Sequence, residues 1–364
     1  MAHVRLVMLA RNEAEHLPAM ADACRGLIDS WCVVVDRRTT DGTFALAPKV
    51  FDYAPGEAHW SDLTADTFDF AAARNEAMSL ASEPGVYQLW LDPDTPPVGT
   101  LPSDLTAPVY IADVRDENGW AWQFPILVRS DVAVRWHLPA HEFLEISAPF
   151  GTWQRLDDVY LQRSGFGADD ARIEWSIKKL REEIAAEAPF APRAMFYIGQ
   201  MLASTDRNEE ALEAFIRRVG MSSNEEEQFF SFIRIGELLV QPTMLDLARA
   251  SRAFLDAYGM RPGRSEPLFY LSHIANAAGN HEMALVFANQ GLLNPPTSDV
   301  QFVMRWIEEW GLRLQWAIAA HHLGNPKAPG VIKELLAHEG IHDNWRIVLE
   351  RYDALPLPKA EVAA

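Results

Sequence analysis

Phe196-Tyr197-Ile198-Gly199 is followed a dozen residues later by Ala211-Leu212-Glu213-Ala214-Phe215, and this stretch decides how the second half of the chain is organised. The same small residues recur further along. Gly199 and Gly236 are 37 residues apart, and Ala211, Ala248 and Ala284 are separated by 37 and 36 residues. A period of this length, with small residues at fixed positions, is typical of stacked helix pairs of the tetratricopeptide (TPR) type. Because each helix pair needs a neighbour to bury its open face, we expect several copies.

The first hundred residues have a different pattern, in which short apolar runs alternate with amphipathic stretches. They predict strands at 4–9, 31–36, 50–53 and 86–91, and helices at 12–26, from 41 onward and at 68–82. Alternating strands and helices indicate a parallel sheet covered on both faces. Runs at 109–113 and 120–128, around the Glu117-Asn118-Gly119 turn, predict an added antiparallel hairpin. The predicted fold is therefore an α/β domain with a Rossmann-like mixed sheet over residues 1–170, followed by an all-α, TPR-like repeat domain over 171–364.

Composition narrows the class of partner. The formal charge is −19, and so acidic a surface disfavours nucleic acid, although a local basic groove would still admit it. The two cysteines, Cys24 and Cys32, form no disulfide framework and have no metal-site spacing, which fits a reducing compartment. No signal peptide and no run of about 20 apolar residues is present, so we expect a cytoplasmic protein without membrane insertion.

Polar motifs follow several predicted strands. Asp92-Pro93-Asp94 closes the fourth strand, and two carboxylates on one side of a strand end are suited to Mg²⁺ or Mn²⁺ bridging a diphosphate. Asp36 closes the second strand, where a carboxylate accepts bonds from a base or ribose. Arg74 could hold a diphosphate by its guanidinium fork. Each motif also has a plainer interpretation, namely an acidic turn, a helix cap at Asp41 or a surface salt bridge.

The motifs occur in an order that resembles the inverting glycosyltransferases of family 2, in the branch that carries TPR repeats. The matching stretches are Ala10 to Glu15, Asp36 to Thr43, Asp69 to Asn75, Leu91 to Asp94, and His141 to Leu144. The resemblance implies a GT-A fold and transfer of a sugar, with inversion, from a nucleotide-diphospho-sugar, most often a UDP-sugar. It covers about the first 167 residues, and the repeats extend it over most of the chain.

The resemblance also assigns roles to residues. Glu142 falls where related enzymes place the catalytic base, and Asp94 and His141 would hold Mn²⁺ or Mg²⁺. Arg163 stands in Gln162-Arg163-Ser164-Gly165-Phe166 where the family has a metal-binding His, and Arg neutralises a diphosphate rather than ligating metal. The nucleotide-sugar contacts would come from Ala10, Asn12, Glu13, Asp36, Arg38, Asp41, Arg74, Asp92 and Arg163.

Several functions fit this assignment. Concave repeat surfaces favour a protein or peptide acceptor, with a polysaccharide, a small molecule or a modified DNA base as alternatives. The repeats could instead serve self-association into a homo-oligomer. A different class of function is a non-catalytic repeat scaffold with a degenerate transferase domain, favoured by Arg37-Arg38 and Arg163 in place of family residues.

Overall fold

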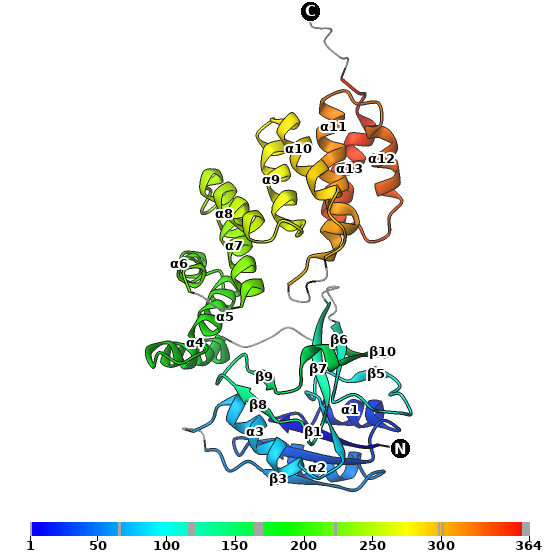
Figure 1. Ribbon diagram of the computed structural model, residues 1–364, viewed down its shortest axis with the longest axis vertical. Helices are drawn as coiled ribbons and strands as arrows, with labels where there is room; N and C mark the ends of the chain where they lie inside the picture. The colour runs from blue at the N-terminus through cyan, green and yellow to red at the C-terminus, as the bar shows by residue number, and fades with distance from the viewer. Residues whose placement is uncertain are drawn as a thin grey trace, which may run out of the picture. The chain divides into compact units, whose positions relative to one another are not determined.

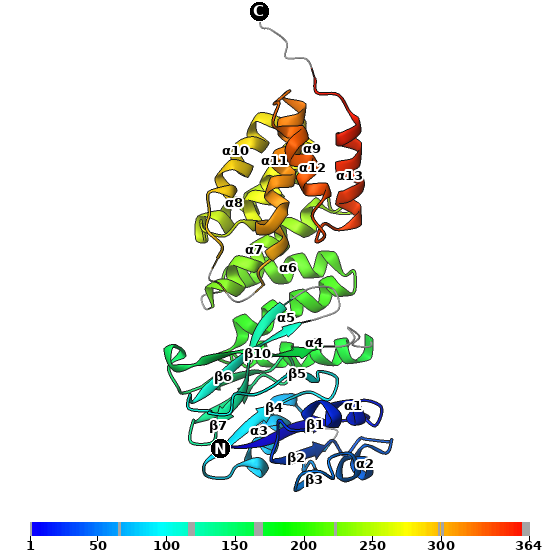
Figure 2. The same cartoon turned by 90° about the vertical axis from the view of Figure 1, so that its right-hand side faces the viewer.

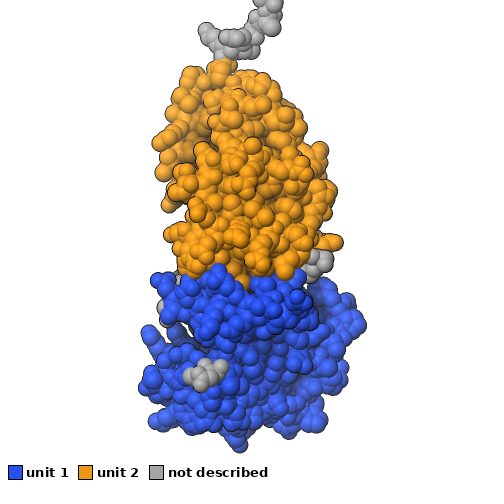
Figure 3. All heavy atoms as spheres, turned by 90° about the vertical axis from the view of Figure 1, so that its left-hand side faces the viewer, with its two compact units in different colours: residues 1–194 blue, residues 195–364 orange. Residues whose placement is uncertain are grey.

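The computed structural model describes residues 2–64, 67–115, 121–163, 170–221, 224–297, 299 and 302–358. The chain divides into two compact units, residues 1–194 and 195–364 (Figure 3). Helix α4 (Asp170–Ala185) starts at the boundary predicted from the sequence but is grouped with the first unit. The predicted Glu117-Asn118-Gly119 turn and residues 164–166 lie outside the described residues.

The first unit is built on a mixed sheet of eight strands with the order β3-β2-β1-β4-β7-β6-β10-β5 (Figure 1). The first four strands in this order are mutually parallel, whereas β7 is antiparallel to both of its neighbours. A separate two-stranded sheet pairs β8 with β9. The strand bounds are β1 His3–Ala10, β2 Ser30–Val35, β3 Gly56–Trp60, β4 Val86–Trp90, β5 Pro97–Gly99, β6 Val109–Arg115, β7 Ala121–Arg129, β8 Val134–His137, β9 Phe143–Ile146 and β10 Gln154–Gln162.

The core of this unit lies on both faces of the sheet because successive side chains of a strand point to opposite sides. In β1, Leu6 and Met8 pack in one apolar cluster with Leu17 of α1, whereas Val7 packs in another with Ala77 of α3. The covering helices are α1 (Leu17–Cys24), α2 (Thr43–Val50) and α3 (Phe70–Ala81). Burial on two faces explains why β1, β2 and β4 are mostly apolar.

Two element predictions in this unit are wrong. The strand expected at 50–53 is instead the end of α2 and a turn, and the third strand is β3, a mostly exposed edge strand without a buried apolar run. The helix expected from residue 12 begins only at Leu17, because Asn12 adopts a positive φ of 55°.

The second unit consists of helices that follow one another in sequence order from α5 to α13 (Figure 2). Pairs form between α7 and α8, α9 and α10, and α11 and α12, and each pair also contacts the next one. A short π-helical turn, Ile307–Gly311, leads into α11. The helix bounds are α5 Ala191–Ser204, α6 Asn208–Val219, α7 Glu225–Val240, α8 Leu247–Met260, α9 Glu266–Ala277, α10 His281–Leu292, α11 Leu312–His322, α12 Ala328–Leu336 and α13 Asp343–Ala354.

Glycines in the first helix of a pair allow the second helix to approach closely. A Cβ atom added at Gly199 would lie 2.8 Å from the ring of Phe215, and one added at Gly236 would lie 2.3 Å from the ring of Phe254. The repeat positions predicted from spacing alone are wrong in the second copy, because Ala248 is exposed whereas Ala250 is buried. The second pair therefore has two additional residues between its helices, which the alanine spacing missed.

Candidate functional site

The carboxyl ends of β1 and β4 and the turn after β8 bring together the charged residues predicted from the sequence. Nε of Arg74 donates to Glu142 over 2.7 Å, and its terminal nitrogen donates to Asp92 over 2.8 Å. The guanidinium also lies 4.7 Å from the ring centroid of Trp136. Burial opposes the charge of Arg74, but the two carboxylates outweigh it and raise the arginine pKa. Arg74 thus pairs with both carboxylates.

The Asp36 carboxylate is likewise paired within the chain. It is 2% exposed and accepts from the backbone N–H of Arg38 over 2.8 Å and from its Nε over 2.9 Å. The Arg38 guanidinium lies 4.0 Å from the ring centroid of Phe68. Burial acts to raise the pKa of Asp36, but the hydrogen bonds and charge of Arg38 lower it overall. Asp36, which was predicted to contact a nucleotide, is therefore already paired with Arg38.

Backbone contacts connect the loops after β1 and β2. The Asn12 amide oxygen accepts from the N–H of Thr40 over 2.8 Å. Asp41 accepts from the N–H of Thr43 over 2.9 Å and from that of Ala14 over 3.1 Å. Ala10 is buried, and its carbonyl accepts from the N–H of Asp36 over 3.0 Å. These residues fix the shape of the sheet edge.

Acidic residues crowd the same edge. Glu13 bonds to Nδ1 of His16 over 2.7 Å, and Oγ1 of Thr95 donates to Asp94 over 2.9 Å. Burial raises the pKa of Glu13, and the nearby charges of Asp94 and Asp92 add to this effect against the opposing His16. The three acids therefore lie close enough to repel one another.

His141 and Arg163 complete the predicted set. His141 has a φ of 52°, in the left-handed region. Desolvation by neighbouring protein atoms lowers the pKa of this histidine to about 4, with Arg172 and Arg193 adding to the effect and Glu142 opposing it, although the residue as a whole is exposed. Arg163 follows β10, and its backbone N–H donates to the carbonyl of Arg115 over 2.8 Å. The lowered pKa favours an uncharged His141 imidazole at neutral pH.

The geometry gives a divalent cation little support. Within the described residues, no group of three or more His, Cys, Asp or Glu side chains is arranged to hold a metal ion. Asp92 already bonds to Arg74. No metal site is established among the described residues, and metal binding by Asp94 and His141 stays a prediction.

A second candidate site, which the sequence reasoning did not find, lies on the first helices of the repeat pairs. We define the A-helix face as the partly exposed residues of α5, α7 and α9 at equivalent repeat positions. Its members recur at intervals of 37 and 36 residues, so the repeat period could have identified them. They are Tyr197, Arg234 and Tyr270, and three residues further along each helix Gln200, Glu237 and His273.

Side-chain contacts join the helices of the A-helix face. Arg234 donates to Glu237 over 2.7 Å, and the Tyr270 hydroxyl bonds to the same carboxylate from α9. Burial and the charge of Glu237 raise the pKa of Tyr270. Two polar atoms of this face, Oε1 of Gln200 and Nε of Arg234, are buried without a hydrogen bond among the described residues. Such atoms are uncommon in folded proteins and call for a partner.

Comparisons with known proteins lead to repeat proteins. No family model matches the chain. A TPR repeat-containing protein of Synechococcus elongatus is 25% identical over 323 residues, which cover 84% of this chain and 70% of that protein.

Among solved structures, TPR proteins match about half of this chain. One from Parabacteroides merdae is 16% identical and covers 50% of this chain and 68% of its own, with a TM-score of 0.39. TTC0263 of Thermus thermophilus is 14% identical, and the match covers 51% of this chain and 92% of that protein, with a TM-score of 0.35. YrrB, described as a TPR protein with an unusual peptide-binding site, is 13% identical. The match covers 50% of this chain and 84% of YrrB, with a TM-score of 0.37.

These findings correct the resemblance drawn from the motifs. The relative that matches most of the chain, including residues ahead of the repeats, is named as a TPR repeat-containing protein. The assignment to family 2, the GT-A identity of the sheet domain and the prediction of an enzyme are therefore wrong. The physical reason is that acidic and basic residues gather at the carboxyl ends of parallel strands in many sheets, so their order is weak support for one activity. No helix of the described residues is long and apolar enough to cross a membrane.

Proposed function

We propose that the protein is a non-catalytic repeat scaffold whose A-helix face binds an extended segment of another protein. The observation that carries this proposal is the relative over 84% of the chain, a TPR repeat-containing protein. The A-helix face supplies a surface for such a segment, since repeat arrays present equivalent side chains in rows along the stack. Self-association through the same face is the competing use.

The unpaired polar atoms of the face support a peptide ligand. Oε1 of Gln200 can accept, and Nε of Arg234 can donate. Both atoms are buried in the free chain, so an extended peptide backbone, which carries both kinds of group at every residue, satisfies them once the two side chains turn outward on binding. Glu237 and His273, which follow Gln200 at the equivalent positions of the next two repeats, add polar side chains that can select among ligands.

A display library of random peptides, selected on the immobilised full chain, tests the proposal. We expect selected peptides to bind wild-type protein and to lose at least tenfold in affinity with Arg234→Ala, as is common for a central arginine at an interface. The matched control is Arg252→Ala on α8, where the side chain is 77% exposed and pairs with Asp256. A surface pair of this kind contributes little.

Three results would contradict the scaffold proposal. A library that yields no binder would do so, as would binders whose affinity is the same in wild type and Arg234→Ala. Sedimentation showing a homo-oligomer that Arg234→Ala dissociates would assign the face to self-association instead.

For the strand-end residues of the first unit, the predicted metal and nucleotide contacts remain separate proposals. Binding of Mn²⁺ by Asp94 and His141 is supported only by their residue types, and nucleotide contact by Asp36 only by its place after β2. We also propose a cytoplasmic location, because Cys24 and Cys32 are both free thiols.

A further inference from the structure

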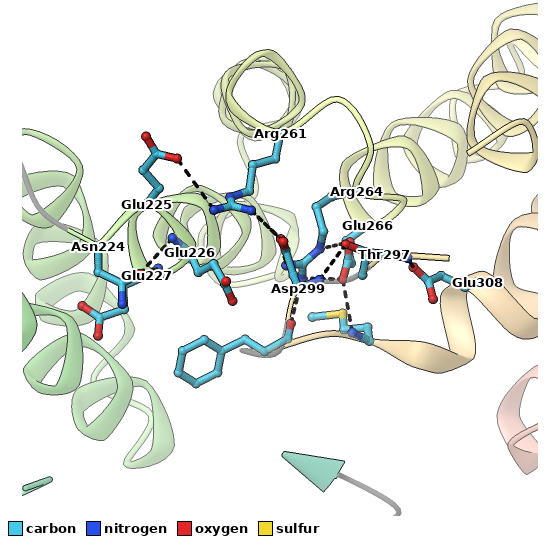
Figure 4. A network of polar contacts seen from close by, with 12 residues as sticks. Asn224, Glu225, Glu226, Glu227, Arg261, Arg264, Glu266, Thr297, Asp299 and Glu308 are labelled. Carbon is cyan, nitrogen blue, oxygen red and sulfur yellow. Dashed lines mark hydrogen bonds and ion pairs between the residues drawn. The ribbon is translucent and has the colours of Figure 1, made fainter. Parts of the chain in front are cut away.

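Two residues of the chain itself contact the repeat helices in the manner of a ligand. They are Asp299 and Phe302, which lie in the sequence between α10 and α11. The Asp299 carboxylate accepts from Arg261 over 2.7 and 2.8 Å and from Arg264 over 3.0 Å (Figure 4). The Asp299 side chain is only 15% exposed. An acidic group is thus held by two arginines that precede it by 38 and 35 residues.

Phe302 forms the second anchor. Its ring stacks on Phe230 of α7, with centroids 4.7 Å apart and an interplanar angle of 16°. It also lies 5.1 Å from the ring of Phe196 of α5. The Phe302 carbonyl accepts from Arg264 over 3.1 Å. The φ of 53° at Phe302 is a backbone conformation that a bulky residue adopts only when its surroundings hold it there.

One arginine of the surface that receives these two anchors is held by a residue outside the connecting segment. We call it the Arg–Phe surface and define it as Arg261, Arg264, Phe196 and Phe230. Glu266 holds Arg264 through two bonds of 2.7 and 3.0 Å, and both side chains are 2% exposed.

Charge on this surface calls for an acidic ligand. Two arginines face one tightly bonded carboxylate, Glu266, and Glu225 approaches Arg261 only to 3.7 Å from an exposed position. One positive charge is therefore balanced mainly by Asp299. A ligand that supplied an acid at this place would meet two guanidinium groups, of which Arg264 is held in place by Glu266, and guanidinium groups favour carboxylates by geometry as well as charge.

We propose that the Arg–Phe surface is a recognition site for partner segments in which an acidic residue precedes an aromatic residue by three positions, and that Asp299 and Phe302 occupy it as an internal competitor. The proposal rests on the proposed scaffold function, because Phe196 and Phe230 lie on the same helices, α5 and α7, as the A-helix face. A tethered competitor acts at an effective concentration of about millimolar. The wild-type chain should consequently bind such partners more weakly than a chain whose own anchors are removed.

The test uses the full chain and a fluorescent peptide with its own sequence from Asn294 to Arg305. We expect the Asp299→Asn, Phe302→Ala double variant to bind this peptide at least tenfold more tightly than wild type, measured by anisotropy. The same two changes made in the peptide should abolish binding. Adding Arg261→Ala to the double variant should lower its affinity about tenfold, whereas adding Arg252→Ala should leave it unchanged.

The outcomes separate this inference from the scaffold function. A folded double variant, with a cooperative unfolding transition, that fails to bind the peptide would overturn the inference. So would binding that is insensitive to the two changes in the peptide. If the double variant does not fold, Asp299→Asn alone preserves the side-chain shape and should still increase peptide binding. Library peptides that bind the A-helix face without the acidic and aromatic pair, and without competing with this peptide, would leave the scaffold function standing and refute only the inference.

Discussion

A methyl group added at Gly236 would test the packing of α7 against α8. Its Cβ atom would lie 2.3 Å from the ring of Phe254, where ordinary carbon contacts lie at about 3.5–4.0 Å. The ring is fully buried and is itself stacked on Tyr270, with centroids 4.7 Å apart, so it has little room to retreat. Gly236→Ala must therefore shift the helices or strain the ring.

The magnitude follows from two opposing effects. Overpacking of this kind costs about 1–3 kcal/mol. Replacing a helical glycine by alanine gains up to about 1 kcal/mol. We expect Gly236→Ala to lower the free energy of unfolding by about 0–2 kcal/mol. Gly259 of α8 is the matched control, because a Cβ atom there meets nothing within 4 Å and keeps the helix gain without the clash.

Thermal unfolding followed by circular dichroism would measure the difference. For domains of 150–250 residues, each kcal/mol corresponds to about 2–4 °C in Tm. Gly236→Ala should melt below Gly259→Ala, and adding Phe254→Leu should recover part of the loss. A Gly236→Ala protein that melts at or above the temperature of Gly259→Ala would show that this glycine does not govern the approach of the two helices.

Three further predictions concern the first unit. Arg74→Met should destabilise this unit by about 1–3 kcal/mol in urea unfolding, because the Glu142 carboxylate is only 14% exposed and would lose its cation. Adding Glu142→Gln should restore part of the lost stability. No recovery would mean that the pair matters through packing alone. The folded pKa of His141, about 4, lies below its usual value, so its contribution to stability is present at pH 7 and is lost as the pH falls toward 4. His141→Gln should flatten that acid-side loss, and an unchanged pH profile of unfolding would contradict the assignment. If Asp94 and His141 bind Mn²⁺, the ion should raise the Tm of wild type but not of Asp94→Ala, and an unchanged wild-type Tm would end the metal proposal.

The sequence was informative where burial leaves a local pattern. β1, β2 and β4 are buried on both faces and appear as apolar runs, so their places could be predicted. β3 is an exposed edge strand, and its pattern was too weak to compete with the apolar residues at 50–53. In the repeats, the period indicated helix pairs, but two additional residues between α7 and α8 moved the buried alanine from Ala248 to Ala250.

The candidate sites were harder to predict because they depend on contacts between distant residues. The strand-end positions of Asp36 and Asp92 followed from the strands, but their pairing with Arg38 and Arg74 did not. The order of such residues was taken as the mark of an enzyme family, which the relative of the chain does not bear out. Asp299 lies 38 residues from Arg261, and no local periodicity links such a pair.

The stacking of Phe302 on α5 and α7 also bears on how the repeat array unfolds. A stack in which each pair touches only its neighbours behaves like a one-dimensional chain, and its end units unravel before its middle. Phe302 comes from the connection beyond α10, yet it reaches Phe196 and Phe230 near the start of the stack. The contacts of Phe302 therefore connect the later part of the repeat stack directly to its first helices. Helices α5 and α7 should accordingly exchange their amide hydrogens together with α9, rather than fraying ahead of it.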